Sequence, residues 1–235
     1  MRSLVKFLFL LLAVPVLVIS CDLGDIEPQN TRYGNSFLPL EVGHYVVYDV
    51  QQILYDELNP NDSSEYQIKE EVAALETGLD NLPFYRIERF RRENSADRWR
   101  IDSVWTAREK NLKIIKTENN IPIVKLALPV ENSKTWNANI YNDQGEDNFQ
   151  IDSLGNSYEV ASTVFPRTLI VNQQYDSSLV NRDVRWEVYA DSVGMVYKKV
   201  ELFKYITNSE DPFYGQDSII GGVFLEMKAI DFGKN

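Results

Sequence analysis

An all-β, mainly antiparallel fold is predicted for most of this 235-residue chain. Short runs of apolar and aromatic residues recur after residue 43, and clusters of Asn, Asp, Gly, Ser and Pro separate them. Several runs alternate apolar with polar residues, which is typical of strands with one buried and one solvated face. About a dozen runs at hairpin spacing predict one domain, either a β-sandwich or a strongly curved, barrel-like sheet with few or no helices.

The first element is a signal peptide over residues 1–20. Two basic residues precede an apolar run over residues 7–19, which is too short to span a bilayer. The run ends in Val-Ile-Ser-Cys, which resembles the lipobox of bacterial lipoproteins and implies lipidation of Cys21. Two or three acyl chains anchor a protein stably, since each buried methylene contributes about 0.8 kcal/mol. We therefore expect an exported protein, lipid-anchored to the outer membrane of a bacterial envelope.

The mature chain divides into a tether and one domain. Residues 21–37 are rich in Gly, Pro, Asn and Asp without an apolar period, so we expect a flexible tether. Residues 38–235 contain no Gly-rich or Pro-rich linker and are predicted to be a single β-rich domain. The two segments "LPLEVGHYVVY" (38–48) and "LPVENSKTWNA" (128–138) are similar, either because the domain has two similar halves or by chance.

The predicted strands follow one another along the domain, with one ambiguous segment. Residues 63–80 have a capping Ser, good helix formers and apolar residues at three-to-four spacing, so helix and strand are both open there. Residues 97–107 alternate most clearly, with the tryptophans on one face and the arginines on the other. The other strand-like runs are 44–58, 83–93, 111–117, 121–128, 148–154, 158–164, 167–171, 184–190, 194–206 and 221–232.

Several of these segments are similar to those of a known group of proteins. "FLPLEVGHYVVYDV" (37–50), "IVKLALPVENSKTWNANIYND" (123–143) and "VRWEVYADSVGMVYKKVE" (184–201) resemble lipoproteins of Bacteroidota that have no established activity. The resemblance covers most of residues 37–232. It implies an exported β-rich lipoprotein and favours a strand at residues 65–76.

Charge and cysteine content exclude several classes of function. Without the signal the chain has 22 basic and 35 acidic residues, a net charge of −13. Nucleic acid is therefore not expected as a partner, because binding to phosphate backbones needs a basic surface. With Cys21 lipidated, no thiol remains for a disulfide, a thiolate nucleophile or a metal site.

No residue is predicted to be catalytic, and no metal or cofactor is expected. His44 is the only histidine, and we interpret it as a strand-entry residue because no Gly-x-Ser-x-Gly motif accompanies it. Residues 56–65 and 141–152 are oxygen-rich but lack the spacing of a calcium loop, so turn chemistry explains them. The four tryptophans are candidates for a stacking groove or for the core: Trp99, Trp105, Trp136 and Trp186.

A basic patch is the least ordinary feature of this acidic chain. Between residues 86 and 116 ten basic residues stand against five acidic ones. Arginine presents a planar fork to phosphate or carboxylate, so the patch is a candidate anion site; the alternative is cross-strand pairing with the surplus acid. The candidate residues are Arg86, Arg89, Arg91, Arg92, Arg98 and Arg100.

Together these features predict a membrane-anchored, non-enzymatic binding or interaction module. Its expected partners are the membrane, through the lipid anchor, and a protein, glycan or lipid of the envelope. One alternative is a carrier that encloses an apolar ligand in its curved sheet, and a second is an envelope hydrolase with paired carboxylates. A carrier needs an apolar cavity of several hundred Å³, and a hydrolase needs two carboxyl groups facing one cleft.

Overall fold

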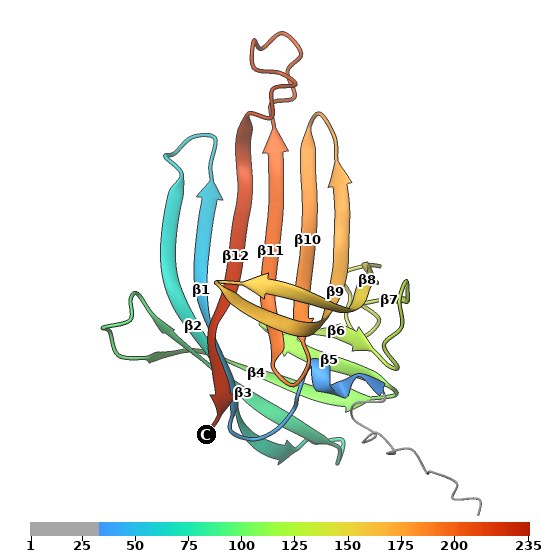
Figure 1. The fold of residues 1–235 in the computed structure, drawn as a ribbon. Coiled ribbons are helices and arrows are strands. Elements are labelled where there is room, and N and C mark those ends of the chain that lie inside the picture. Colours follow the sequence, from blue (N-terminus) through green and yellow to red (C-terminus); the bar gives the residue numbers. More distant parts are fainter. Residues whose placement is uncertain (1–32) are drawn as a thin grey trace, which may run out of the picture.

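The computed structural model describes residues 33–235. The predicted signal peptide, Cys21 and most of the predicted tether lie outside the described residues. Twelve strands form one antiparallel sheet, as predicted, and the helical content of the described residues is a single 3-10 turn, η1 (Asn35–Phe37) (Figure 1). The strands are β1 (His44–Tyr55), β2 (Asp62–Thr77), β3 (Pro83–Arg92), β4 (Arg100–Lys110), β5 (Lys113–Glu118), β6 (Ile121–Ala127), β7 (Thr135–Asn137), β8 (Asn148–Val160), β9 (Thr163–Ser177), β10 (Asn181–Ala190), β11 (Gly194–Tyr205) and β12 (Ile219–Lys234).

The strand order makes a nearly closed, barrel-like sheet. Each strand pairs with its neighbours in the chain, and β12 returns to pair with β1. The one interruption in this cycle lies between β6 and β7. There the Val124 N–H donates to the Ala138 carbonyl at 2.9 Å, and the Trp136 indole N–H donates to the Val124 carbonyl at 2.8 Å. The structure therefore selects the barrel-like sheet over the sandwich.

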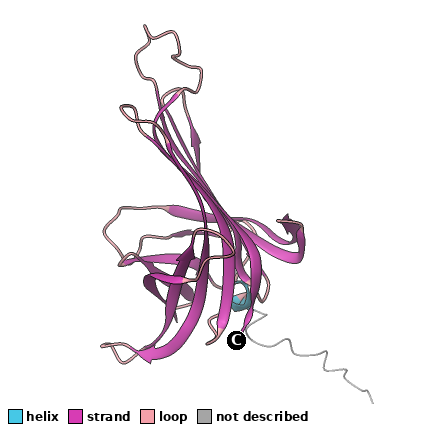
Figure 2. Ribbon diagram, turned by 90° about the vertical axis from the view of Figure 1, so that its left-hand side faces the viewer, coloured by secondary structure: helices cyan, strands magenta, loops and turns pink. Residues whose placement is uncertain are grey.

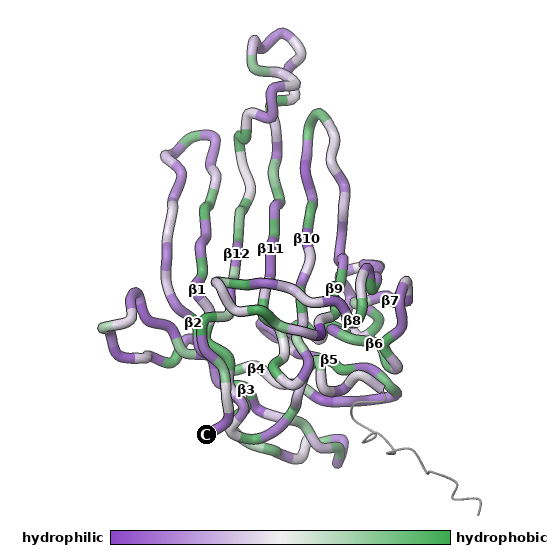
Figure 3. Tube along the Cα trace, viewed as in Figure 1, coloured by the Kyte–Doolittle hydropathy of each residue, from purple (hydrophilic) through white to green (hydrophobic). Residues whose placement is uncertain are grey.

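The sheet has a closed lower part and an open upper part. In Figure 1, β2, β1, β12, β11, β10 and β9 stand side by side and extend upward, whereas β3–β6 turn across the lower part. Figure 2 shows the upper part edge-on as a single layer. Burial follows this division: on β1 the buried residues end at Val50, and residues 51–55 are partly or fully exposed. Apolar and polar residues continue to alternate along the upper strands (Figure 3).

Two large cores and a small cluster of Val72, Ile87 and Ala107 hold the lower part together. One large core fills the barrel beside the β6–β7 gap and includes Phe37, Leu126, Trp136 and Leu169. The other lies partly outside the barrel, where the β8–β9 hairpin crosses in front of β10–β12 (Figure 1). Two pairs of aromatic rings pack there: Tyr158 with Tyr197, with centroids 6.1 Å apart, and Phe165 with Phe232, with centroids 5.6 Å apart.

A short segment before β1, Phe37–Gly43, crosses the lower end of the barrel, and we call it the strap. Phe37 is fully buried, and the Gly43 N–H donates to the Val72 carbonyl at 2.8 Å. The two similar Leu-Pro segments of the sequence share one core, since Leu38 of the first packs against the cluster that contains Leu128 of the second. Each segment precedes a run of six consecutive strands, β1–β6 and β7–β12.

Of the two alternatives open for residues 63–80, the strand is observed, because residues 62–77 form β2. Pairing with β1 on one side and β3 on the other satisfies the backbone between strands instead of within a helix, and this tertiary pairing overrides local propensity. The apolar residues at helical spacing separate: Ile68 and Val72 are buried, whereas Leu75 is 54% exposed.

The strict alternation expected over residues 97–107 is wrong. The pairing of β3 with β4 shifts register between Arg89–Ser103 and Phe90–Ile101, so Asp102 is an extra residue in β4. Ile101 is consequently 60% exposed and does not share the buried face with Trp105. A bulge of this kind cannot be read from the period of a single strand, because it depends on the register of the partner.

Candidate functional site

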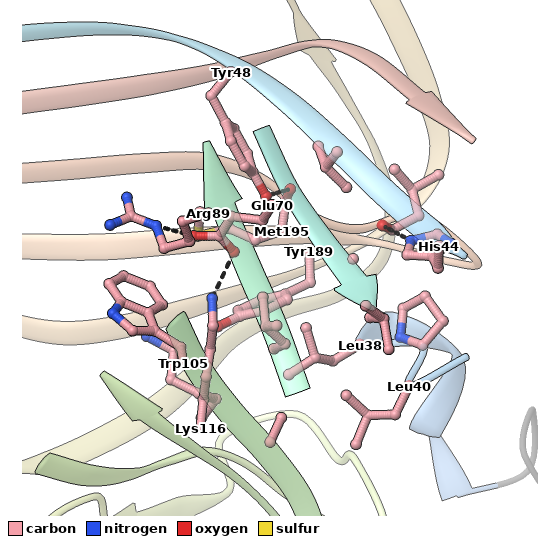
Figure 4. Close-up of a pocket in the computed structure, with 18 of the residues that line it drawn as sticks. Leu38, Leu40, His44, Tyr48, Glu70, Arg89, Trp105, Lys116, Tyr189 and Met195 are labelled. Atoms are coloured by element: carbon pink, nitrogen blue, oxygen red, sulfur yellow. Dashed lines mark hydrogen bonds and ion pairs between the residues drawn. The ribbon is translucent and has the colours of Figure 1, made fainter. Parts of the chain in front are cut away.

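The barrel encloses a small cavity directly above the strap (Figure 4). Its volume is about 70 Å³, which is room for a few water molecules. One wall is apolar and includes Leu38 and Leu40 of the strap together with Val46 and Met195. The opposite wall is ionic. A wider depression of about 910 Å³ lies at the lower opening, where the strap, β3, β4 and the end of β12 meet.

The ionic wall belongs to a continuous row of alternating charges that we call the interior ionic chain. Nitrogen–oxygen distances of 2.6 to 3.7 Å join its neighbours. The Tyr189 hydroxyl donates a further hydrogen bond to Glu187. In order, the members are Asp102, Arg89, Glu70, Lys116, Glu118, Lys125, Glu187 and Lys198.

Most of this chain is removed from water. The Glu187 side chain is 1% exposed and that of Lys125 is 5% exposed, and the two are 2.7 Å apart. Isolated charges at such depth would be very unfavourable, but each charge here has an opposite charge on at least one side. The four cations and four anions balance, so the row is neutral as a whole.

The electrostatics of the chain keep Glu118, Glu187 and Lys125 ionised. Burial alone raises the pKa of the Glu118 carboxyl, but Lys125, Lys198 and Lys116 outweigh it and lower this pKa from 4.5 to about 2. The pKa of Glu187 is lowered in the same way, against its burial, by Lys125 and Lys198. Desolvation lowers the pKa of Lys125, yet Glu118 and Glu187 raise it overall.

This arrangement is suited to holding strands together and unsuited to acid catalysis. A general acid at neutral pH needs a carboxyl group whose pKa is raised, whereas those of Glu118 and Glu187 are lowered. The chain joins strands that are far apart in the sequence, since Lys125 lies on β6 and Glu187 on β10. It therefore ties the two sides of the β6–β7 gap together across the barrel.

His44 lies at the start of β1, as predicted, and lines the cavity. Its Nε2 is 2.8 Å from the Val193 carbonyl oxygen, so this nitrogen carries the proton and donates. The hydrogen bond connects the strap end to the β10–β11 turn. This contact gives His44 a structural role.

The predicted arginine patch splits into two groups. The first group pairs with the chain's own acid, as the cross-strand alternative predicts. Arg89 leaves the surface altogether: its side chain is 14% exposed and joins the interior ionic chain. The pairs are Arg86 with Glu76 and Glu88, Arg89 with Glu70 and Asp102, and Arg91 with Glu93.

The second group comprises Arg92, Arg98 and Arg100, at the tip of the β3–β4 hairpin. Every other arginine of residues 33–235 has an ion pair, whereas these three have none. They border a surface groove of about 740 Å³ together with Arg91 and Trp99. We call it the hairpin groove.

The tryptophans do not form one stacking surface. Trp136 belongs to the core, where its ring meets Phe149 edge-on at 6.0 Å. The other three each lie under a cation. These contacts are Arg89 over Trp105 at 3.9 Å, Arg92 over Trp99 at 4.2 Å and Lys199 over Trp186 at 5.2 Å.

Turn chemistry accounts for the two oxygen-rich loops. The Asp56 carboxylate accepts hydrogen bonds from the backbone N–H groups of Leu58 and Asn59 at 2.8 and 3.1 Å. In the second loop the Asn142 side-chain oxygen accepts from the Gln144 N–H at 2.9 Å. Among residues 33–235, no group of three or more His, Cys, Asp or Glu residues is placed to hold a metal ion.

Sequence reasoning missed the interior ionic chain. A signal was present, because Lys125 interrupts the apolar run "IPIVKLAL" and Glu187 interrupts "VRWEVYA". A charge at the position where an apolar residue continues the pattern indicates a buried partner. The partners themselves, on strands 62 residues apart, could not be read from the pattern.

No protein-family profile matches the chain, and no curated protein is significantly similar to it. Within residues 33–235, no helix is long and apolar enough to cross a membrane.

Proposed function

We propose that this protein is a non-enzymatic interaction module of a bacterial envelope, attached to the membrane through lipidated Cys21. The upper layer of the sheet is its partner-binding surface. This proposal rests chiefly on one observation: six strands extend beyond the barrel as a single layer whose two faces both carry apolar side chains that the described residues do not cover.

The inner face of this layer carries a row of aliphatic side chains. Leu54 on β1 pairs in register with Val223 on β12, which pairs in register with Leu202 on β11. Leu54 is 43% exposed and Leu202 is 37% exposed. Beside them, Leu225 and Val200 are also paired and partly exposed. Contiguous apolar surface of this kind is typical of a protein-interaction site.

The opposite face of the layer carries aromatic side chains. Tyr55 and Phe203 flank Gly222 on neighbouring strands, and their rings meet edge-on at 5.5 Å. Phe203, which is partly exposed, also contacts the buried Tyr205, with ring centroids 6.5 Å apart. Aromatic side chains with one side exposed contribute strongly to protein interfaces.

The alternatives receive less support from the barrel interior. A carrier of an acyl chain requires a cavity of about 300–1,000 Å³, and the interior cavity has about 70 Å³ and an ionic wall. A hydrolase requires a carboxyl group that can donate a proton, and the interior carboxylates are held ionised by lysines.

The proposal is tested by cross-linking the membrane-anchored protein in cells that carry a charged double variant, Leu54→Lys with Leu202→Lys. Both side chains are exposed, so the domain remains folded while the apolar row is interrupted. We expect the cross-linked partner bands of the wild type to disappear. The matched control is Leu58→Lys, which places the same charge on a loop residue that is 89% exposed. Partner bands that persist in the double variant, or that vanish equally in the control, refute the proposed surface.

The anchor is tested separately by labelling with palmitate. We expect the wild type to incorporate label and Cys21→Ser to incorporate none. Equal labelling of the two proteins, or no labelling of either, would refute lipidation at this residue.

A further inference from the structure

We infer that the hairpin groove is a binding site for an oxyanion, a phosphate or carboxylate group presented by a small molecule or a lipid head group. The site goes beyond the proposed interaction surface on the upper sheet and does not depend on it. Its direct ligands are Arg92, Arg98 and Arg100.

Arginines without an ion pair are concentrated in the hairpin groove. The chain carries 35 acidic residues and a net charge of −11, so an arginine readily finds a carboxylate. Seven of the ten arginines in residues 33–235 do so. The three that do not are gathered in one groove, although Glu93, Asp97 and Asp102 also border it.

These three arginines retain free hydrogen-bond donors. A guanidinium group has five N–H donors. Arg92 uses two of its N–H groups: one donates to the Gln67 side-chain oxygen at 2.6 Å and the other to the Ser95 carbonyl at 3.2 Å. Arg98 and Arg100 donate to no group of the described residues. Both side chains are exposed and can turn their forks toward a ligand in the groove.

The register of the β3–β4 hairpin places two arginines opposite each other. Arg91 on β3 stands directly opposite Arg100 on β4. Like charges in direct cross-strand positions repel each other, and Glu93 compensates only one member of the pair. An anion bound between the two strands would relieve this repulsion, which gives the groove a preference for negative charge.

Aromatic rings hold two guanidinium groups of the groove in place before a ligand binds. Arg92 lies 4.2 Å above the Trp99 ring and Arg91 lies 3.7 Å above the Tyr66 ring. Stacking fixes the plane of each guanidinium. The N–H edge of Arg91 faces Glu93, whereas Arg92 keeps donors beyond those given to Gln67 and Ser95. Less conformational entropy is then lost when an oxyanion binds. The groove volume of about 740 Å³ accommodates a phosphorylated small molecule or a head group.

The experiment titrates inorganic pyrophosphate into the detergent-solubilised, lipidated protein by isothermal calorimetry. We expect saturable binding that weakens with added salt. In Arg98→Gln with Arg100→Gln we expect at least a tenfold loss of affinity with no fall in melting temperature, because neither arginine has an ion pair and Arg100 stands opposite Arg91. The control Arg108→Gln removes one positive charge from an exposed pair with Asp80 and should leave affinity within twofold.

A second arm distinguishes the two sources of the oxyanion. Mixed micelles containing phosphatidylglycerol are compared with micelles containing phosphatidylcholine, in the wild type and in the double variant. Stronger binding to phosphatidylglycerol that the double variant loses assigns a lipid head group; binding of pyrophosphate alone assigns a soluble phosphate. Absence of saturable binding of either probe, equal affinity in the double variant, or an equal loss in Arg108→Gln overturns the inference. None of these outcomes affects cross-linking through Leu54 and Leu202, so the two proposals fail independently.

Discussion

Replacing Lys125 by methionine tests the role of the interior ionic chain. Methionine has a similar length and volume, so the substitution removes the charge without opening a large cavity. It leaves the Glu187 carboxylate, which is 1% exposed, without its partner at 2.7 Å. Glu118 also loses Lys125, which lies 3.6 Å away.

The expected cost follows from what remains. Removing one member of a buried ion pair typically costs about 3–5 kcal/mol, because the other charge stays desolvated. Glu187 keeps Lys198 at 3.1 Å and Glu118 keeps Lys116 at 3.7 Å, so we expect a loss near the lower end, about 3 kcal/mol. For a domain of this size the loss corresponds to a fall of roughly 6–12 °C in melting temperature.

Urea unfolding followed by tryptophan fluorescence measures this loss directly, provided the slope of free energy against urea is unchanged. The control is Lys234→Met, because Lys234 and Glu41 form an exposed pair, with side chains 56% and 57% exposed, that should contribute about 0–1 kcal/mol. Adding Glu187→Gln to Lys125→Met should cost less than the sum of the single changes by about 1–3 kcal/mol. A cost for Lys125→Met equal to that of the control, or strict additivity in the double variant, would refute the coupling.

Three further predictions concern pH, backbone geometry and the strap. The pKa of Glu118 is lowered from 4.5 to about 2, so its contribution to stability is present above pH 4.5 and is lost as pH falls toward 2; Glu118→Gln should flatten the acid limb of a pH–stability profile, and an unchanged limb would contradict this. At Gly222 a Cβ atom would lie 1.9 Å from the Leu202 carbonyl oxygen with φ at +130°, so Gly222→Ala should cost at least about 2 kcal/mol in urea unfolding. The adjacent Gly221 is the control: its added Cβ would lie 3.9 Å from the nearest atom, so Gly221→Ala should cost no more than about 1 kcal/mol of unfolding free energy. Similar costs for the two variants would contradict the predicted clash at Gly222. Phe37→Ala should lose about 3–5 kcal/mol in the same assay, because this fully buried ring attaches the strap to the barrel core, and a loss below 1 kcal/mol would show that the strap is not anchored there.

Fold class could be predicted from the sequence because strand signals are local. Alternation of apolar and polar residues and the turn residues between runs are properties of short segments, and they located most strands, including 44–55 and 219–234, within a few residues. The local pattern of residues 62–77 did not predict their structure, because it is helical. These residues form β2 because they pair with the neighbouring strands β1 and β3.

The candidate sites were predictable only in part, and the arginines show why. All six arginines of the predicted patch have similar sequence surroundings, yet Arg89 is drawn into the barrel by Glu70 while Arg98 and Arg100 stay unpaired at the hairpin tip. Their separation depends on which acidic residue on another strand comes opposite each arginine. One extra residue at Asp102 shifts that register, and no single-strand pattern reports it.

By itself, the sequence determined that residues 38–235 form an antiparallel β-rich domain and that His44 begins a strand, and it predicts an anchor at Cys21. Tertiary structure alone decided that twelve strands close into one barrel-like sheet, that Lys125 meets Glu187 inside it, and that the upper layer stays open on both faces. The reason is the range of the interactions. Strand formation is encoded by neighbouring residues, whereas closure and charge pairing join residues dozens of positions apart, whose meeting depends on the register of every strand between them.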